Sequence, residues 1–174
     1  MKNKYFLSRR SLVTQGVAAV ALLPLAQALG AQSSGPGTQA ALAAATDSEL
    51  IYITALSEEG STGRCQAEVW FVAADHEFWV VTAGDSWRAR NAAENARVKI
   101  WVGDVGQWQA ADGAYQSLPA LIARSTLENA ADIQQRALAL FGAKYPASWT
   151  RWGPRFKNGL ADGSRVLIRY QPQA

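Results

Sequence analysis

The stretch that decides the fold is residues 69–82, VWFVAADHEFWVVT. Two runs of β-branched and aromatic residues flank Ala74-Asp75-His76, and such residues favour strands. The pattern predicts two strands, over residues 64–73 and 77–82, that are joined by a tight turn. The chain is therefore expected to contain an antiparallel sheet.

Further strands are predicted on both sides of this hairpin. They cover residues 50–56, 97–102, 107–111, 114–124 and 165–170. Residues 97–102 and 165–170 alternate between polar and apolar, as half-buried strands do. With the hairpin, these segments predict a mainly β fold with flanking helices, a six- to seven-stranded antiparallel split β-barrel.

Two helices are predicted between the strands. Ser86 is a suitable N-cap for a short helix over residues 87–95. Ser125 and Glu128 resemble a capping box, and the helix behind them is expected to end near Leu140 with Gly142 as its cap. Residues 145–158 show no clear period and are expected to be irregular.

The N-terminal segment is typical of an export signal. Arg9-Arg10 precedes an apolar stretch from Val17 to about Leu29. This pattern predicts a twin-arginine signal peptide over residues 1–31, recognition by the twin-arginine translocase, and a periplasmic or otherwise exported location. A Sec signal with a chance arginine pair is the alternative. The apolar stretch is shorter than the roughly 20 residues of a spanning helix, so no stable membrane anchor is expected.

Removing this signal changes the charge of the chain. Of 17 basic and 14 acidic residues, four basic and no acidic ones lie in residues 1–31, which leaves 13 against 14. The charge therefore gives no reason to expect nucleic-acid binding. Residues 32–48 are typical of a linker, although their alanine run could form a short helix, and the domain is expected to cover residues 49–174.

The block around the hairpin resembles a known superfamily. Four pieces carry the resemblance in order: WFV at 70–72, FWVVT at 78–82, SWRARN at 86–91 and NARV at 95–98. This succession is similar to that of the pyridoxamine-phosphate-oxidase-like split β-barrel superfamily. Here Arg88 takes the place of the usual lysine and Ala96 that of the usual proline. The similarity covers residues 50–103 well, and the rest only by the order of elements.

The resemblance implies a cofactor and a dimer. Many members bind FMN, some bind a deazaflavin or haem, and the fold commonly forms a homodimer with flavin at the subunit interface. It implies that this chain is an oxidoreductase that passes hydride or electrons between flavin and a small-molecule redox substrate. The alternative is a non-catalytic binding or partner-interaction module with the same barrel.

Several residues of the block could bind the cofactor. Thr82, at a strand end, and Ser86, at a helix start, offer hydroxyls beside free backbone N–H groups, which suits a phosphate. Arg88 would add a charge-assisted contact. The resemblance adds Arg64, which opens the neighbouring strand, and Trp87 could cover a bound ring. In the purely structural alternative, Ser86 only caps its helix and Arg88 is solvated.

Other residues weaken or limit this hypothesis. Glu68 lies where FMN-binding relatives often carry a basic residue, and a carboxylate near a phosphate is unfavourable unless it points away. Residues 149–156, WTRWGPRF, interleave aromatic and basic side chains; packing is favoured over ligand stacking there. His76, the only histidine, has no recognisable partner, so no catalytic residue is predicted. The lone cysteine, Cys65, excludes a thiolate metal cluster, and no metal site is expected.

Overall fold

The computed structural model describes residues 35–63 and 67–173, which belong to one compact unit. Its strands are β1 (Leu50–Ala55), β2 (Ala67–Trp70), β3 (Val72–Ala74), β4 (Glu77–Ala83), β5 (Arg97–Val102), β6 (Ala120–Glu128) and β7 (Arg165–Pro172). Its helices are α1 (Pro36–Ala44), α2 (Trp87–Ala93), α3 (Ala131–Lys144) and α4 (Pro146–Asp162), with a 3₁₀ turn, η1 (Ala114–Ser117). The predicted export signal over residues 1–31, Arg64 and Cys65 lie outside the described residues.

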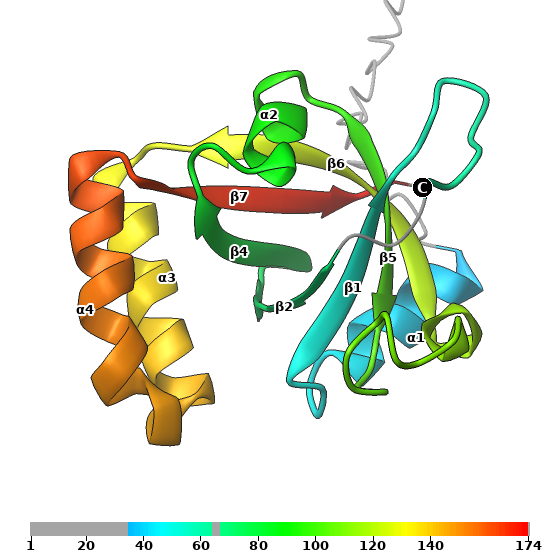
Figure 1. Cartoon of the computed structure of the whole chain (residues 1–174), viewed down its shortest axis with the longest axis horizontal. Coiled ribbons are helices and arrows are strands. Elements are labelled where there is room, and N and C mark those ends of the chain that lie inside the picture. Colours follow the sequence, from blue (N-terminus) through cyan, green and yellow to red (C-terminus); the bar gives the residue numbers. More distant parts are fainter. Residues whose placement is uncertain (1–34, 64–66, 174) are drawn as a thin grey trace, which may run out of the picture. The chain divides into compact units, whose positions relative to one another are not determined.

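The strands form one seven-stranded antiparallel sheet in the order β2-β1-β5-β6-β7-β4-β3. β2 and β3 occupy the two edges of this sheet, yet only Phe71 separates them along the chain. The sheet therefore has to curl until its edges approach each other, and Figure 1 shows it curled in this way. This arrangement confirms the predicted split barrel with flanking helices.

Tyr145 holds the one-residue link between the two sheet edges. Its hydroxyl accepts the backbone N–H of Phe71 at 3.0 Å and lies 2.8 Å from the carbonyl oxygens of Phe71 and Glu49. Its ring stacks on that of Trp70, with centroids 4.5 Å apart and planes 7° apart. Burial raises the pKa of Tyr145. The phenol therefore stays neutral and satisfies backbone groups that the break between β2 and β3 leaves without strand partners.

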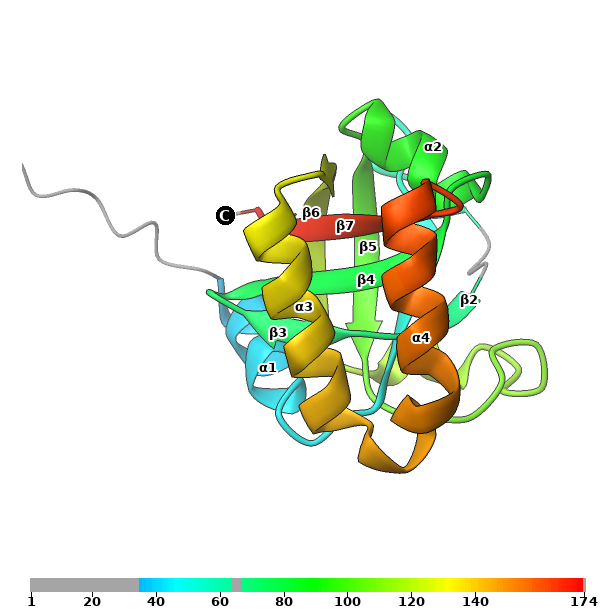
Figure 2. The same ribbon diagram turned by 90° about the vertical axis from the view of Figure 1, so that its left-hand side faces the viewer.

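Apolar side chains fill both faces of the curled sheet. The inside of the barrel holds a cluster that includes Phe71, Phe78, Ile100 and Ile168, all fully buried. A second cluster joins the outer face of β4 and β7 to α3 and α4, through Trp79, Leu167, Phe141 and Phe156 among others. Figure 2 shows α3 and α4 side by side in front of β4 and β7. Of these two helices, α4 forms one wall of the groove described below.

The boundaries predicted for the helix between Ser125 and about Leu140 are wrong. Ser125 does not cap a helix: it lies in β6, fully buried, and its hydroxyl donates to the carbonyl of Ala96 at 2.8 Å. β6 continues to Glu128 because it pairs with β7, so α3 begins only at Ala131. Gly142 lies inside α3, where a Cβ would approach Trp149 Nε1 to 2.9 Å. Pairing with a distant strand therefore overrides the local capping pattern.

The prediction that residues 145–158 are irregular is also wrong. Residues 146–158 belong to α4, for which Tyr145 is the N-cap, and the helix starts with Pro146, at a position that tolerates proline. Gly153 lets Trp149 pack closely, since a Cβ there would lie 2.8 Å from Trp149 Cε2. Close packing at Gly153 therefore accompanies a helix whose sequence shows no clear period.

Two shorter segments also differ from expectation. Residues 107–111 form no strand, and the chain from Gly103 to Pro119 turns through η1 over the outer face of β1 and β5. There the buried Tyr115 stacks on Tyr52, with ring centroids 5.5 Å apart, and anchors the segment to the sheet. Residues 36–44, expected in a linker, form α1, whose Ala41 is fully buried in the barrel core. The short helix suggested by the alanine run is therefore present.

Candidate functional site

A groove of about 510 Å³ opens between β2, the end of β4, α2 and α4. Two of the predicted cofactor-binding residues, Thr82 and Arg88, line it. The opposite wall is aromatic and consists of Trp70, Trp152 and Phe156. A polar end and an aromatic wall in one cavity are the usual features of a small-molecule site.

The polar end is built by the turn that joins β4 to α2. β4 carries Thr82 into the barrel mouth, where the residue is only 4% exposed. Gly84 then lies so close to the chain before β7 that a Cβ would be 2.9 Å from the carbonyl oxygen of Gly163. Ser86 caps α2, and its Oγ accepts the N–H of Ala89 at 3.2 Å. This cap turns the first residues of α2 back toward the end of β4.

Three predicted residues meet at this turn. Arg88 donates to Thr82 Oγ1 from Nη2 at 2.9 Å and from Nε at 3.2 Å. Thr82 Oγ1 lies 3.4 Å from Ser86 Oγ. The motif thus forms a connected cluster of two hydroxyls and one guanidinium. Ser86 acts as a cap and also belongs to this cluster, so the structural and the ligand-binding readings of this serine are compatible.

Arg88 is a partly buried cation. Burial lowers its pKa, although not enough to remove its charge at neutral pH. Its guanidinium carbon lies 5.6 Å from the centre of the Trp87 ring, a cation–π distance. Within the described residues no carboxylate forms an ion pair with Arg88, whereas Arg136 pairs with one carboxylate and Arg169 with two. An anion in the groove would supply the missing counter-charge.

The aromatic wall also carries positive charge. The guanidinium of Arg165, which lines the groove, lies 5.4 Å from the centre of the Phe156 ring. Arg151 and Arg155 lie 5.5 and 5.0 Å from the Trp152 ring centre. Trp152 meets Trp70 edge to face, with centroids 6.2 Å apart. This wall combines surfaces for a flat ring with cations for negative groups.

In the basic and aromatic run at residues 149–156, one aromatic residue packs in the core and two line the groove. Trp149 stacks against Phe141 with ring centroids 6.4 Å apart and does not line the groove. Trp152 lines it, and Phe156 contacts both the groove and Phe141. Trp152 and Phe156 are four residues apart and therefore lie on one face of α4, which faces the groove.

Glu68 lines the groove as the single carboxylate among the residues that form it. Its Oε2 accepts the backbone N–H of Trp108 at 3.3 Å. One carboxylate oxygen is therefore held toward the segment between β5 and β6. This contact reduces, without removing, the conflict between Glu68 and an anionic ligand.

The other predicted residues lie elsewhere. Trp87 does not line the groove, and its indole Nε1 is buried without a hydrogen-bond partner in the part of the chain that the structure describes. Arg64 is outside the described residues. His76 is exposed in the turn between β3 and β4 and has a φ of 63°. Among residues 35–63 and 67–173 no cluster of histidine, cysteine or carboxylate side chains could hold a metal.

Sequence reasoning did not single out Arg165. It reaches the groove because β7 pairs with β4, where Arg165 lies opposite Ala83. Only knowledge of that pairing would have identified it, since the two positions are 82 residues apart in the sequence. Trp152 was considered, and its place in an alternating aromatic and basic run was a usable signal.

Comparison with solved structures identifies the fold. The haem storage protein HutZ from Vibrio cholerae is 15% identical, with a TM-score of 0.51 over 76% of this chain and 87% of the other. A conserved hypothetical protein from Mycobacterium tuberculosis is 17% identical, with a TM-score of 0.53 over 76% and 78%. A protein of unknown function from Agrobacterium tumefaciens is 19% identical, with a TM-score of 0.54 over 82% of this chain and 56% of that one.

These similarities show that the chain shares its fold with these proteins. No family model matches the chain, and no curated protein matches its sequence. None of the helices in the described ranges is long and apolar enough to cross a membrane.

Proposed function

We propose that this chain is an exported protein that binds a flavin, FMN or a deazaflavin, in the groove at Thr82 and Arg88, and that it acts as an oxidoreductase. The observation that carries the proposal is Arg88. It is a partly buried guanidinium, without a carboxylate partner among the described residues, at the polar end of a groove with an aromatic wall. A phosphorylated aromatic ligand matches both ends of such a groove.

The residues present fit the parts of a flavin nucleotide. Arg88 and the hydroxyl of Thr82 would bind the phosphate, and Arg165 would add a second cation to the same cavity. Trp70 and Trp152 would lie against the ring system and exclude water from it. A bound flavin supplies hydride or electron transfer, while the protein binds, orients and shields it. No acid or base residue is assigned, since the groove offers Glu68 alone and that carboxylate contacts the backbone.

Two further parts of the proposal come from the sequence. The arginine pair at Arg9-Arg10 supports export through the twin-arginine route, which carries proteins that are already folded. The resemblance to the split-barrel superfamily supports a homodimer, in which a second copy would cover the open side of the groove.

A non-catalytic binding module is the second candidate. Glu68 favours it, because a carboxylate in the groove opposes an anionic ligand, and Arg88 already has a hydrogen-bond acceptor in Thr82. The visible spectrum of the purified protein distinguishes the two candidates. We expect the absorption bands of a bound flavin, or their appearance after incubation with FMN. A colourless protein that takes up neither FMN nor a deazaflavin would leave the binding module as the better account.

A further inference from the structure

Two arginines of α4 lie at the edge of the groove, beside its aromatic wall. Arg151 and Arg155 are exposed, and their guanidinium carbons lie 5.5 and 5.0 Å from the centre of the Trp152 ring, which lines the groove. Within the described part of the chain neither guanidinium forms an ion pair with a carboxylate. The edge of the groove therefore carries two positive charges without a carboxylate partner in that part.

The spacing of these two arginines is unfavourable for the helix alone. Residues four apart are neighbours on a helix surface, with Cβ atoms about 5–6 Å apart, and two like charges at this spacing repel each other. No acidic residue of α4 relieves this repulsion. The other positions three or four residues from either arginine in the helix are Ala147, Ser148, Trp152, Pro154, Asn158 and Gly159. An anion held between the two guanidinium groups would relieve it.

Contact with Trp152 positions both arginines without using their charge. A guanidinium that lies over an aromatic ring keeps N–H groups free at the edge of its own plane. These donors suit a carboxylate, which a guanidinium binds through two parallel hydrogen bonds. The aromatic contact therefore prepares both side chains to bind an anion.

The flavin phosphate does not need these two arginines. A phosphate monoester carries about 1.5 to 2 negative charges at neutral pH, and Arg88 and Arg165 already supply two positive charges to the groove. Glu68 is the single carboxylate among the residues that line it. Asp162, the acidic residue of α4, accepts the N–H of Ser164 at 2.9 Å at the C-terminal end of the helix. The edge of the groove therefore stays positive when a flavin phosphate is bound.

We propose that Arg151 and Arg155 bind the negative group of the redox substrate, and that this substrate is a small organic anion such as a carboxylate. The two guanidinium groups hold the anion beside Trp152, next to the ring system that the groove binds. Their positive potential also raises the local concentration of anions and so the rate of association. This role rests on the flavin function proposed above, because the substrate has to meet the flavin at this edge.

Anaerobic oxidation of the FMN-loaded protein, reduced beforehand with dithionite, tests the proposal. The probes are 1,4-naphthoquinone and its 2-sulfonate, which differ by one negative group. In both reactions two electrons and two protons pass from the reduced flavin to the quinone, so the flavin is oxidised and the quinone becomes a hydroquinone. Stopped-flow absorption of the flavin gives the quinone concentration at which the rate is half-maximal.

The double variant Arg151→Gln/Arg155→Gln should raise that concentration roughly threefold to tenfold for the sulfonate and leave it unchanged for the neutral quinone. Added salt should cause a similar loss in the wild type, since the two guanidinium groups are exposed. The FMN affinity of the double variant should equal that of the wild type, because neither arginine lines the groove.

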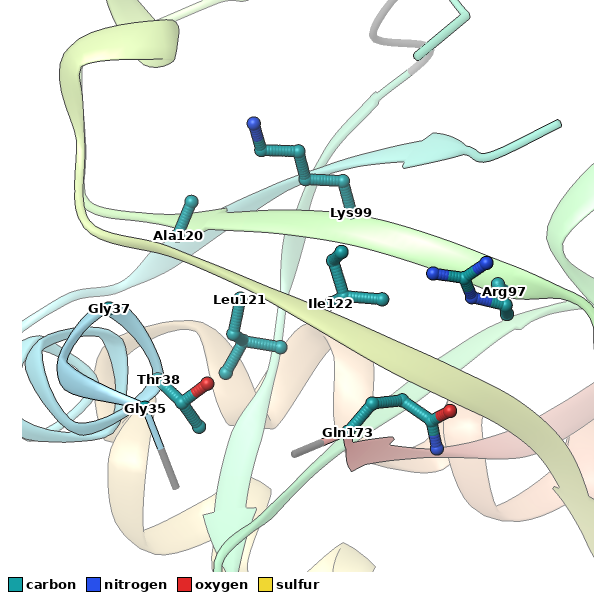
Figure 3. Close-up of a pocket in the computed structure, with 9 residues that line it drawn as sticks. All are labelled: Gly35, Gly37, Thr38, Arg97, Lys99, Ala120, Leu121, Ile122 and Gln173. Atoms are coloured by element: carbon teal, nitrogen blue, oxygen red, sulfur yellow. The ribbon is translucent and has the colours of Figure 1, made fainter. Parts of the chain in front are cut away.

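Arg97 and Lys99 offer a matched control. They line a separate hollow beside α1 (Figure 3), which shares no lining residue with the groove. Arg97→Gln/Lys99→Gln removes the same number of positive charges and should leave both quinone reactions unchanged.

The outcomes distinguish this proposal from the flavin function on which it rests. An unchanged sulfonate reaction in Arg151→Gln/Arg155→Gln, an equal loss with both quinones, or an equal loss in the two double variants would overturn the role of these arginines alone. A protein that takes up no flavin would overturn the flavin function and this role together.

Discussion

Arg88 and Thr82 are joined by two hydrogen bonds from one guanidinium to one hydroxyl oxygen, 2.9 Å long from Nη2 and 3.2 Å long from Nε. This contact fixes the side chain of Arg88 without neutralising its charge, because a hydroxyl carries none. The remaining N–H groups of Arg88 stay available to a ligand. A positioned cation of this kind costs less conformational entropy when it binds an anion than a free surface arginine does.

Ser86 is expected to contribute to stability more than to ligand affinity. Its Oγ accepts the N–H of Ala89 at 3.2 Å, whereas its contact with Thr82 is long, at 3.4 Å. Ser86→Ala should lower the free energy of unfolding by about 1 kcal/mol, the usual value of an N-cap. Urea unfolding measures this change. Ser86→Gly, which keeps a tolerated cap residue, should cost less; an unfolding free energy unchanged in Ser86→Ala would remove the capping role.

Tyr145 is expected to hold the junction of β2 and β3 through its hydroxyl. Tyr145→Phe would leave the buried N–H of Phe71 without its partner. The free energy of unfolding should fall by about 1–3 kcal/mol. Tyr115→Phe is a matched control, because within the described part of the chain the hydroxyl of Tyr115 makes a single, long contact, at 3.4 Å with Gln116. Equal losses in the two variants would show that the hydroxyl of Tyr145 has no special role.

Lys144 should make stability rise with pH in the alkaline range. Burial lowers its pKa from about 10.5 to about 8, and its Nζ lies 3.5 Å from the centre of the Phe71 ring. Between these two values the unfolded chain holds a proton that the folded chain has released, so raising the pH favours the folded state. Burial raises the pKa of Tyr145 and Tyr170, and their opposing effect therefore begins only above about pH 10.

Urea unfolding at pH values from about 7.5 to 9.5 checks the effect of Lys144. The free energy of unfolding should increase across this range in the wild type. In Lys144→Met it should stay flat, since no proton is lost. The same slope in both proteins would assign the pH dependence to another group.

The segment before β1 should be part of the folded domain and no simple linker. Ala41 is fully buried in α1, whereas its neighbour Ala40 is exposed. Ala41→Asp should lower the melting temperature by several degrees, because it buries an unpaired charge in the core. Ala40→Asp introduces the same charge at the surface and should change it little. Calorimetry measures the melting temperatures of the two variants. An equally small change in both would favour a dispensable linker.

The sequence predicted the strands well because their alternation is a local property. The turn between β3 and β4 and the strands at 50–55, 97–102 and 165–172 follow from side-chain pattern alone. The single strand predicted over residues 64–73 is wrong, because the chain breaks at Phe71 into β2, which pairs with β1, and β3, which pairs with β4. The prediction that Ser125 caps a helix is wrong because its local pattern fits a cap, while the pairing of β6 with β7 keeps it in a strand. The prediction for residues 145–158 is wrong because their apolar residues show no clear period, although the segment packs as a helix against α3 and the sheet.

Some residues of the candidate site could be predicted from a local motif, and others could not. Thr82, Ser86 and Arg88 are close in sequence, and one turn brings them together, so a local motif was enough to place them. Arg165 comes to the groove through long-range strand pairing, and Trp152 through the packing of α4. Trp87 has a suitable residue type at a suitable place in the motif, but it is not among the residues that line the groove.

The most direct test of the flavin proposal compares FMN with riboflavin, which lacks the phosphate, in fluorescence titrations of wild type and Arg88→Ala. The wild type should bind FMN more tightly than riboflavin. Arg88→Ala removes a charge-assisted contact and should weaken FMN binding roughly tenfold to hundredfold, with little effect on riboflavin. Arg90→Ala, on the exposed side of α2, is the control and should leave both affinities unchanged. Equal affinity of the wild type for the two ligands, no binding of either, or an FMN affinity unaltered in Arg88→Ala would contradict this account.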